Sequence, residues 1–128
     1  MSGRLLVFGS RDYRDRATLW NAIGERAPAV VIQGDCRTGA DKFAKQWAQF
    51  YRQPHLDFPA DWTLGHKAGP IRNHEMHREG RPDEAIGFIS GKAGSPFSRG
   101  SAGMAAICRK AGTPQGGDAA DGLSRGRG

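Results

Sequence analysis

Cysteine is scarce in this chain of 128 residues, and the placement of the two cysteines narrows its class. Cys36 and Cys108 lie far apart and form no C-x-x-C pair, so the sequence indicates neither a disulfide framework nor a zinc site. No apolar run approaches the length of a membrane span, and residues 1–4 lead into a short apolar stretch without a signal-peptide core. These absences favour a cytoplasmic protein with free thiols and no membrane contact.

Carboxylates are missing from one long segment. No Asp or Glu occurs between Glu84 and Asp118, so the net charge of +6 is unevenly spread. That segment contains four basic side chains, Lys92, Arg99, Arg109 and Lys110. Residues 1–16 are also basic, with four arginines against two aspartates. Both segments include the turn after a predicted strand, where an α/β sheet can bind an anion, although a basic face that only aids solubility would look the same.

The chain does have a regular alternation of short apolar runs with helical patterns. Apolar runs predict strands at residues 5–8, 29–33, 53–58 and 84–89, and helical patterns predict helices at residues 16–26, 38–51, 70–79 and 104–111. Because each strand leaves through a glycine-bearing loop, we expect an α/β fold with a parallel sheet and its site at the carboxyl edge of the strands. Residues 1–112 form the predicted domain. Residues 113–128 contain one Leu and no periodicity, which predicts a disordered Gly-rich tail.

The turn after the first strand has the composition of an anion site. Gly9 and Ser10 break the apolar run, and Asp15 can cap a helix that begins at Arg16. The unpaired N–H groups of such a helix point at a ligand, glycine allows it to approach the backbone, and Arg11 adds a planar fork that fits a phosphate. The alternative is an ordinary strand-to-helix turn with a solvated arginine.

The second helix has the clearest pattern in the sequence. Thr38 and Asp41 have the spacing of a capping box at its start. Four aromatic residues follow at helical spacing, namely Phe43, Trp47, Phe50 and Tyr51. We interpret this stripe as core rather than as a surface for a cofactor.

The third helical segment has a poor apolar stripe, so its polar residues need another role. Pro70 suits the first turn of a helix, and Lys67 and Arg72 stand on either side of it. We expect both cations to contact an anion together with Arg11. Asn73 fits the edge of a base or ribose, or else it is a turn residue.

Five further residues near this helix have two readings each. Trp62 suits stacking on a base or burial in the core, and Asp61 suits a ribose hydrogen bond or a turn. The three histidines, His66, His74 and His77, lack the spacing of the H-E-x-x-H zinc signature. We therefore expect surface histidines, no bound metal and no cofactor.

Four motifs occur together in one order. They are Gly-Ser-Arg at residues 9–11, GDCRTGAD at residues 34–41, PADW at residues 59–62 and KAGPIRN at residues 67–73, followed by Met76. Over residues 4–112 the chain resembles the YspA, or cpYpsA-related, branch of the SLOG superfamily. The resemblance implies a Rossmann-like, three-layer α/β/α fold with a mostly parallel sheet of four to five strands. It also implies binding of a nucleotide or nucleotide-derived signal, of the ADP-ribose or nucleotide-sugar type.

Together with the residue patterns, the resemblance implies a set of ligand-binding residues. They are Gly9, Ser10, Arg11, Gly34, Arg37, Gly39, Asp41, Asp61, Trp62, Lys67, Gly69, Arg72, Asn73, Gly91, Gly94 and Ser95. Three features depart from the family pattern. The loop before Gly39 starts Gly34-Asp35 instead of Gly-Gly, which brings a charge that opposes a phosphate, although Asp tolerates a positive φ. The compact fourth glycine loop is replaced by residues 90–103, and the usual closing strand after Gly112 is missing.

Relatives in the superfamily suggest two alternatives to simple binding. Phosphoribohydrolases of the lonely-guy type have a Glu after the fourth glycine loop, where N-glycosidic hydrolysis needs a carboxylate, and this chain lacks it. Four other carboxylates could substitute, namely Asp35, Asp41, Asp61 and Glu75. The single-strand DNA binder DprA suggests a nucleic-acid binder that uses the basic face. We rank a nucleotide-binding sensor or sequestering module first, a nucleotide-processing hydrolase second and a nucleic-acid binder third, and the sequence leaves homo-oligomer formation open.

Overall fold

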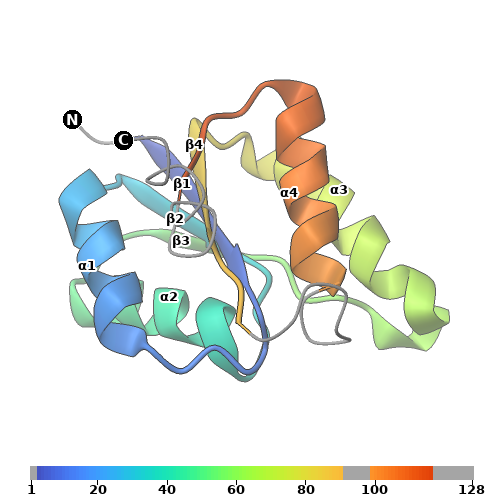
Figure 1. The fold of residues 1–128 in the computed structure, drawn as a ribbon, viewed down its shortest axis with the longest axis horizontal. Coiled ribbons are helices and arrows are strands. Elements are labelled where there is room, and N and C mark those ends of the chain that lie inside the picture. Colours follow the sequence, from blue (N-terminus) through green and yellow to red (C-terminus); the bar gives the residue numbers. More distant parts are fainter. Residues whose placement is uncertain (1–2, 91–98, 117–128) are drawn as a thin grey trace.

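The computed structural model describes residues 3–90 and 99–116 of the chain. Its elements in chain order are β1 (Arg4–Gly9), α1 (Arg16–Arg26), β2 (Val30–Gln33), α2 (Gly39–Phe50), β3 (His55–Asp57), the 3-10 helix η1 (Trp62–Lys67), α3 (Ala68–Gly80), β4 (Glu84–Phe88), α4 (Arg99–Ala111) and β5 (Gln115–Gly116). The strands form one parallel sheet in the order β3-β2-β1-β4-β5. The helices α1 and α2 cover one face of this sheet, and α3 and α4 cover the other (Figure 1). This is the Rossmann-like, three-layer α/β/α fold that the sequence predicts.

The central strand β1 is apolar throughout because both of its faces are covered. Leu5 and Val7 pack with the residues of α1 and α2, whereas Leu6 and Phe8 pack with those of α3 and α4. All four side chains are at most 5% exposed. A strand that is buried on both faces has no polar alternation, which explains the continuous run in the sequence. Within the described residues, no helix is long and apolar enough to cross a membrane.

Helix α1 begins where the sequence predicts. The Asp15 carboxylate accepts the backbone N–H of Thr18 at 3.1 Å and its hydroxyl at 2.6 Å. These bonds satisfy a backbone donor that the first helical turn leaves free. The prediction of an Asp15 cap is therefore confirmed.

The aromatic stripe of α2 is core only in part. Trp47 is buried as predicted, but Phe50 and Tyr51 are 68% and 53% exposed, so their assignment to the core is wrong. The two exposed rings pack against Trp20 of α1, with centroids 5.6 and 6.1 Å from its ring. Helical spacing marks residues on one face, but it does not tell whether that face meets the sheet or a neighbouring helix.

The predicted capping box of α2 does not form. Thr38 is the N-cap residue, yet its side chain makes no capping hydrogen bond. Asp41 accepts the backbone N–H of Cys36 in the preceding loop instead. The Asp41 carboxylate therefore binds the loop that follows β2, at the edge of the sheet.

The carboxyl-terminal part of the domain differs from the prediction in two ways. Helix α4 begins at Arg99 rather than at residue 104, because packing against α3 and the sheet stabilises a Gly-rich first turn that has low intrinsic helix propensity. A closing strand is also present, since Ala85 and Ile86 of β4 pair with Gln115 and Gly116 of β5. The expected absence of this strand is wrong, and the ordered sheet extends past the predicted boundary at residue 112. Helix α3 also starts two residues before Pro70.

Candidate functional site

A cleft of about 1040 Å³ opens at the carboxyl edge of the sheet. The chain leaves β1 toward one helical layer and leaves β4 toward the other, and such a switch point is where open α/β sheets bind ligands. The cleft is lined by Phe8, Gly9, Arg11, Gly34, Asp35, Cys36, Arg37, Thr38, Asp41, Pro59, Ala60, Trp62, His66, Gly69, Pro70, Arg72, Asn73, Met76, Gly100, Ser101 and Met104. Its walls therefore come from both helical layers, from η1 and from the turns after β1, β2 and β3.

Two glycines allow the walls of the cleft to approach one another. A Cβ at Gly34 would collide with a guanidinium nitrogen of Arg72, and a Cβ at Gly39 would collide with the carbonyl oxygen of Ser10. Gly39 also has a positive φ of 73°, which disfavours any side chain. Gly34 therefore makes room for Arg72, and Gly39 lets the start of α2 pack against the turn after β1.

Arg72 forms one wall of the cleft through hydrogen bonds within the protein. Its Nη1 donates to the carbonyl oxygens of Gly34 at 2.6 Å and Phe58 at 3.3 Å, and its Nε donates to Oδ1 of Asn73 at 2.9 Å. The Nδ2 of Asn73 donates in turn to the carbonyl oxygen of Gly100 at 3.1 Å. Arg72 thus brings a positive charge to the cleft while it joins the loops after β2 and β3 to α3.

Asp41 is a buried carboxylate on this wall, with only 9% of its surface exposed. Burial raises the pKa of Asp41 to about 6, against the opposing effects of the Arg72 charge and of the hydrogen bond from the Cys36 N–H. The charge of Arg11 also favours the ionised form, and the charge of Asp35 disfavours it. A carboxyl group with such a pKa in a cleft can exchange a proton near neutral pH.

Arg11 reaches the cleft from the turn after β1, and Trp62 reaches it from the start of η1. The guanidinium carbon of Arg11 lies 5.1 Å from the centroid of the Trp62 ring, which is the geometry of a cation–π contact. Trp62 is 54% exposed, so it is not the core residue of the alternative reading. Its turn is held by Asp61, which accepts the backbone N–H of Thr63 at 3.1 Å.

Asp35 has a partner that reduces its conflict with an anion. Its φ of 56° lies in the left-handed region, as the Gly-Asp replacement requires. Its carboxylate accepts Nζ of Lys45 at 2.9 Å, and the same ammonium lies 3.4 Å from Asp57. The pKa of Lys45 is raised, chiefly by the hydrogen bond to Asp35. The negative charge at this cleft-lining position is therefore paired with a cation.

The structure brings together nine of the predicted binding residues. Those that line the cleft are Gly9, Arg11, Gly34, Arg37, Asp41, Trp62, Gly69, Arg72 and Asn73. Four others, Ser10, Gly39, Asp61 and Lys67, do not line it. Gly91, Gly94 and Ser95 lie outside the described residues.

Of the four residues that do not line the cleft, Ser10 and Asp61 have structural roles in addition to that of Gly39 described above. Ser10 is fully buried, and its hydroxyl accepts the backbone N–H of Ser90 at 3.0 Å. This bond joins the turn after β1 to the end of β4. Asp61 fixes its own turn, which is the second of the two readings that the sequence left open.

Sequence reasoning missed several residues that reach the cleft from α4 and from η1. Gly100 and Ser101 line it because α4 starts earlier than predicted, Met104 lines it from the next turn of that helix, and His66 lines it from η1. Burial of Ser101, at 5% exposure, fits a first helical turn that faces inward. Within the described ranges, no three His, Cys, Asp or Glu side chains are grouped so as to hold a metal ion.

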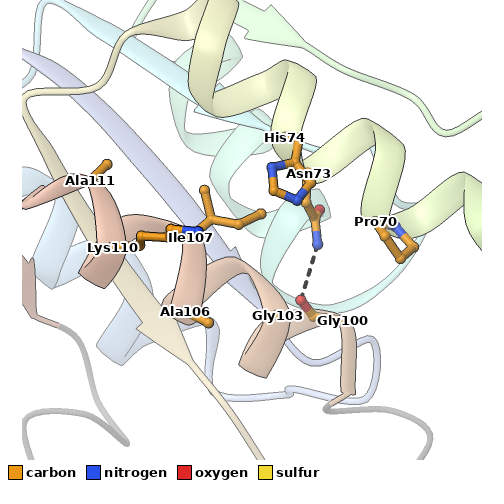
Figure 2. A pocket seen from close by; sticks show the side chains of 9 residues that line it. All are labelled: Pro70, Asn73, His74, Gly100, Gly103, Ala106, Ile107, Lys110 and Ala111. Atoms are coloured by element: carbon orange, nitrogen blue, oxygen red, sulfur yellow. Dashed lines mark hydrogen bonds between the residues drawn. The ribbon is translucent and has the colours of Figure 1, made fainter.

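A second hollow of about 610 Å³ lies between α3 and α4 (Figure 2). It shares Pro70, Asn73 and Gly100 with the cleft. Small and apolar residues of α4 form most of its other wall, and His74 and Lys110 are its ionisable lining residues. The hydrogen bond from Asn73 to Gly100 therefore stands at the wall that both hollows share.

Comparison with known proteins agrees with this fold and site. A protein-family model, YAcAr, described as the YspA, cpYpsA-related SLOG family, matches residues 3–65, from β1 into η1. The Gene 61 protein of Mycobacterium phage D29 is 40% identical over 101 residues, which cover 70% of this chain and 79% of the phage protein. The chain belongs to the YspA, cpYpsA-related SLOG family. Membership indicates a nucleotide-derived ligand in general terms.

Proposed function

We propose that this protein binds a nucleotide or nucleotide-derived small molecule, of the ADP-ribose or nucleotide-sugar type, in the cleft at the carboxyl edge of its sheet. In the cell it acts as a cytoplasmic sensor or sequestering module. The observation that carries the proposal is the convergence of Arg11, Trp62 and Arg72 on one cleft at the switch point of the sheet. A planar cation, an exposed aromatic ring and a half-buried cation together suit a ligand that has phosphate and base.

The lining residues suggest a role for each part of the ligand. Arg11 and Arg37 line the cleft, make no hydrogen bond or ion pair with another described residue and suit phosphate oxygens, and Arg72 adds a fixed positive charge. The first turns of α3 and α4 contribute lining residues, so the positive ends of two helix dipoles also face the cleft. Trp62 offers a ring on which a base can stack. Asp41 suits a ribose hydroxyl.

One observation favours the hydrolase as a second candidate. Of the four carboxylates that could replace the missing Glu, Asp61 holds a turn, Glu75 does not line the cleft, and Asp35 is paired with Lys45. Asp41 lines the cleft, and burial raises its pKa to about 6. A carboxyl group in that condition suits general acid–base work at an N-glycosidic bond. Release of free base from AMP or ADP-ribose, abolished by Asp41→Asn, is the expected sign of this activity.

A thermal-shift panel of nucleotides, nucleotide sugars and ADP-ribose compounds tests the proposed binding. A ligand that binds only the folded state raises the Tm. With the best ligand, we expect Arg11→Ala to weaken binding by about 1.5–3 kcal/mol, because a charge-assisted contact is lost. Arg72→Lys, which keeps the charge and loses the fork, should also weaken it. The matched control is Arg109→Ala, at an exposed position of α4 that does not line the cleft.

The same variants separate a small-ligand site from a nucleic-acid surface. A short single strand bound by the basic face would lose affinity steeply with salt, and Arg109→Ala would reduce the slope by about one unit. Tight binding of the strand with that salt slope, together with nucleotide binding that Arg11→Ala leaves intact, would contradict the proposal.

A further inference from the structure

In the free protein, the guanidinium group of Arg11 covers one face of the Trp62 ring. The two residues are 51 positions apart in the chain, yet the guanidinium carbon lies 5.1 Å from the centre of the ring. Both residues line the cleft. Arg11 makes no hydrogen bond or ion pair with another described residue, and besides the ring it has only the longer-range attraction of its charge to Asp41 within that part of the chain. The exposed face of an aromatic ring and the open fork of an arginine are the two groups that a nucleotide would use.

We propose that Arg11 and Trp62 form a clasp that a nucleotide opens by exchange. The inference rests on the proposed function of the same cleft and specifies the ligand class that it selects. The base takes the place of the guanidinium on the Trp62 ring, and the released guanidinium turns to the phosphate. The exchange replaces one exposed cation–π contact by a stacked base and a charge-assisted hydrogen bond, both of which are stronger.

The surroundings of the two residues fit such an exchange. The Trp62 ring lies beside the start of α3, where a Cβ added to Gly69 would be 3.9 Å from its Cη2, and its turn is held by Asp61, which accepts the N–H and the hydroxyl of Thr63. Arg11 is an exposed side chain on a turn. The ring therefore stays in place while the longer and less constrained guanidinium is the group that moves.

The clasp makes the cleft selective for compounds that carry an aromatic base and a phosphate in one molecule. A nucleoside supplies the base but gives the displaced guanidinium no new partner. A sugar phosphate supplies the anion but leaves the ring uncovered when Arg11 departs. Only a nucleoside phosphate, alone or as part of a larger compound such as ADP-ribose, replaces both halves of the contact. The effects of base and phosphate on affinity should therefore be cooperative.

Titration of AMP, adenosine and ribose 5-phosphate into wild type and Arg11→Ala tests the exchange. Arg11→Ala should weaken AMP binding about tenfold or more, because the phosphate loses its partner. The same variant should bind adenosine about two- to fivefold more tightly than wild type does, because the ring is already uncovered. An arginine that acts through charge alone would weaken AMP binding and leave adenosine unchanged. Arg109→Ala should change the affinity for neither AMP nor adenosine, because Arg109 does not line the cleft.

A second measurement on the free protein reports on the clasp directly. The chain has three tryptophans, so the emission of Trp62 is obtained as the difference between a protein and its Trp62→Phe counterpart. Acrylamide should quench Trp62 more strongly in Arg11→Ala than in wild type. Equal quenching, or adenosine affinity unchanged by Arg11→Ala while AMP still binds wild type, overturns the clasp and leaves the proposed function standing. If wild type binds no nucleotide, the proposed function fails and the clasp with it.

Discussion

Replacement of Asp41 by asparagine tests whether the buried, ionised carboxylate of Asp41 lowers the free energy of unfolding. Burial raises the pKa of Asp41 from 3.8 to about 6, although the Arg72 charge acts in the opposite direction. The folded state therefore holds the proton more tightly than the unfolded chain does, so folding stability falls as the pH rises from about 4 to about 6 and stays lower above that. At about 1.4 kcal/mol per pH unit, the loss by pH 8 is about 3 kcal/mol.

Asparagine retains an oxygen that can accept the Cys36 N–H and removes the charge. We expect Asp41→Asn to match wild type near pH 4 and to be more stable by up to about 3 kcal/mol at pH 8, or about 10 °C in Tm. Urea denaturation at pH 4, 6 and 8 measures the difference, with Glu79→Gln at an exposed position of α3 as the control. If the asparagine variant is the less stable protein at pH 8, the attraction of Arg72 and Arg11 outweighs the cost of burial. Greater stability with lost nucleotide binding would mark a residue kept for function.

Three further outcomes follow from the fold and the cleft. Trp47→Ala should destabilise the domain by about 3–5 kcal/mol in urea denaturation, because the ring is buried between α2 and the sheet, and an unchanged midpoint would refute that packing. A chain that ends at Gly112 should melt about 5 °C or more below one that ends at Gly116, since it lacks β5 and the hydrogen bond of Thr113 to His77, and equal Tm values would show that β5 adds nothing. Asp35→Gly should bind AMP a few times more tightly by calorimetry, because it removes a negative charge from the cleft and keeps a residue that accepts a φ of 56°; weaker binding would mean that Asp35 contacts the ligand.

The apolar pattern located the sheet wherever strands are buried on both faces. β1 and β4 read as continuous apolar runs for that reason, and Asp15 marked the start of α1 through a local hydrogen bond. β5 consists of Gln115 and Gly116, whose place in the sheet depends on backbone pairing and carries no apolar signal. The start of α4 was hidden in the same way, because packing against α3 stabilises a turn whose composition resembles a loop.

The candidate site could be predicted in part, because Arg11 follows a strand and Arg72 lies near the start of a helix. Arg11 and Arg72 were expected in one cleft and both line it. The sequence did not reveal that Arg72 donates hydrogen bonds to the carbonyl oxygens of Gly34 and Phe58, because these acceptors lie 38 and 14 residues away in the chain. Nor did it reveal that Asp41 accepts the Cys36 N–H instead of completing a capping box with Thr38. The same spacing of Thr38 and Asp41 is compatible with either hydrogen bond. Long-range hydrogen bonds of this kind come from the assembled fold alone.

The hydrogen bonds of Ser10 make the sheet side of the cleft more rigid than the opposite side. Ser10 donates its N–H to the Phe88 carbonyl and accepts the Ser90 N–H at its hydroxyl, so the ends of β1 and β4 cannot separate without breaking both bonds. The opposite wall is η1, in which no residue is buried and Gly65 has a φ of 73° with open space around it. Ligands of different length should therefore be accommodated by displacement of the part of η1 around Gly65, beyond the Trp62 turn, while the sheet side keeps its shape.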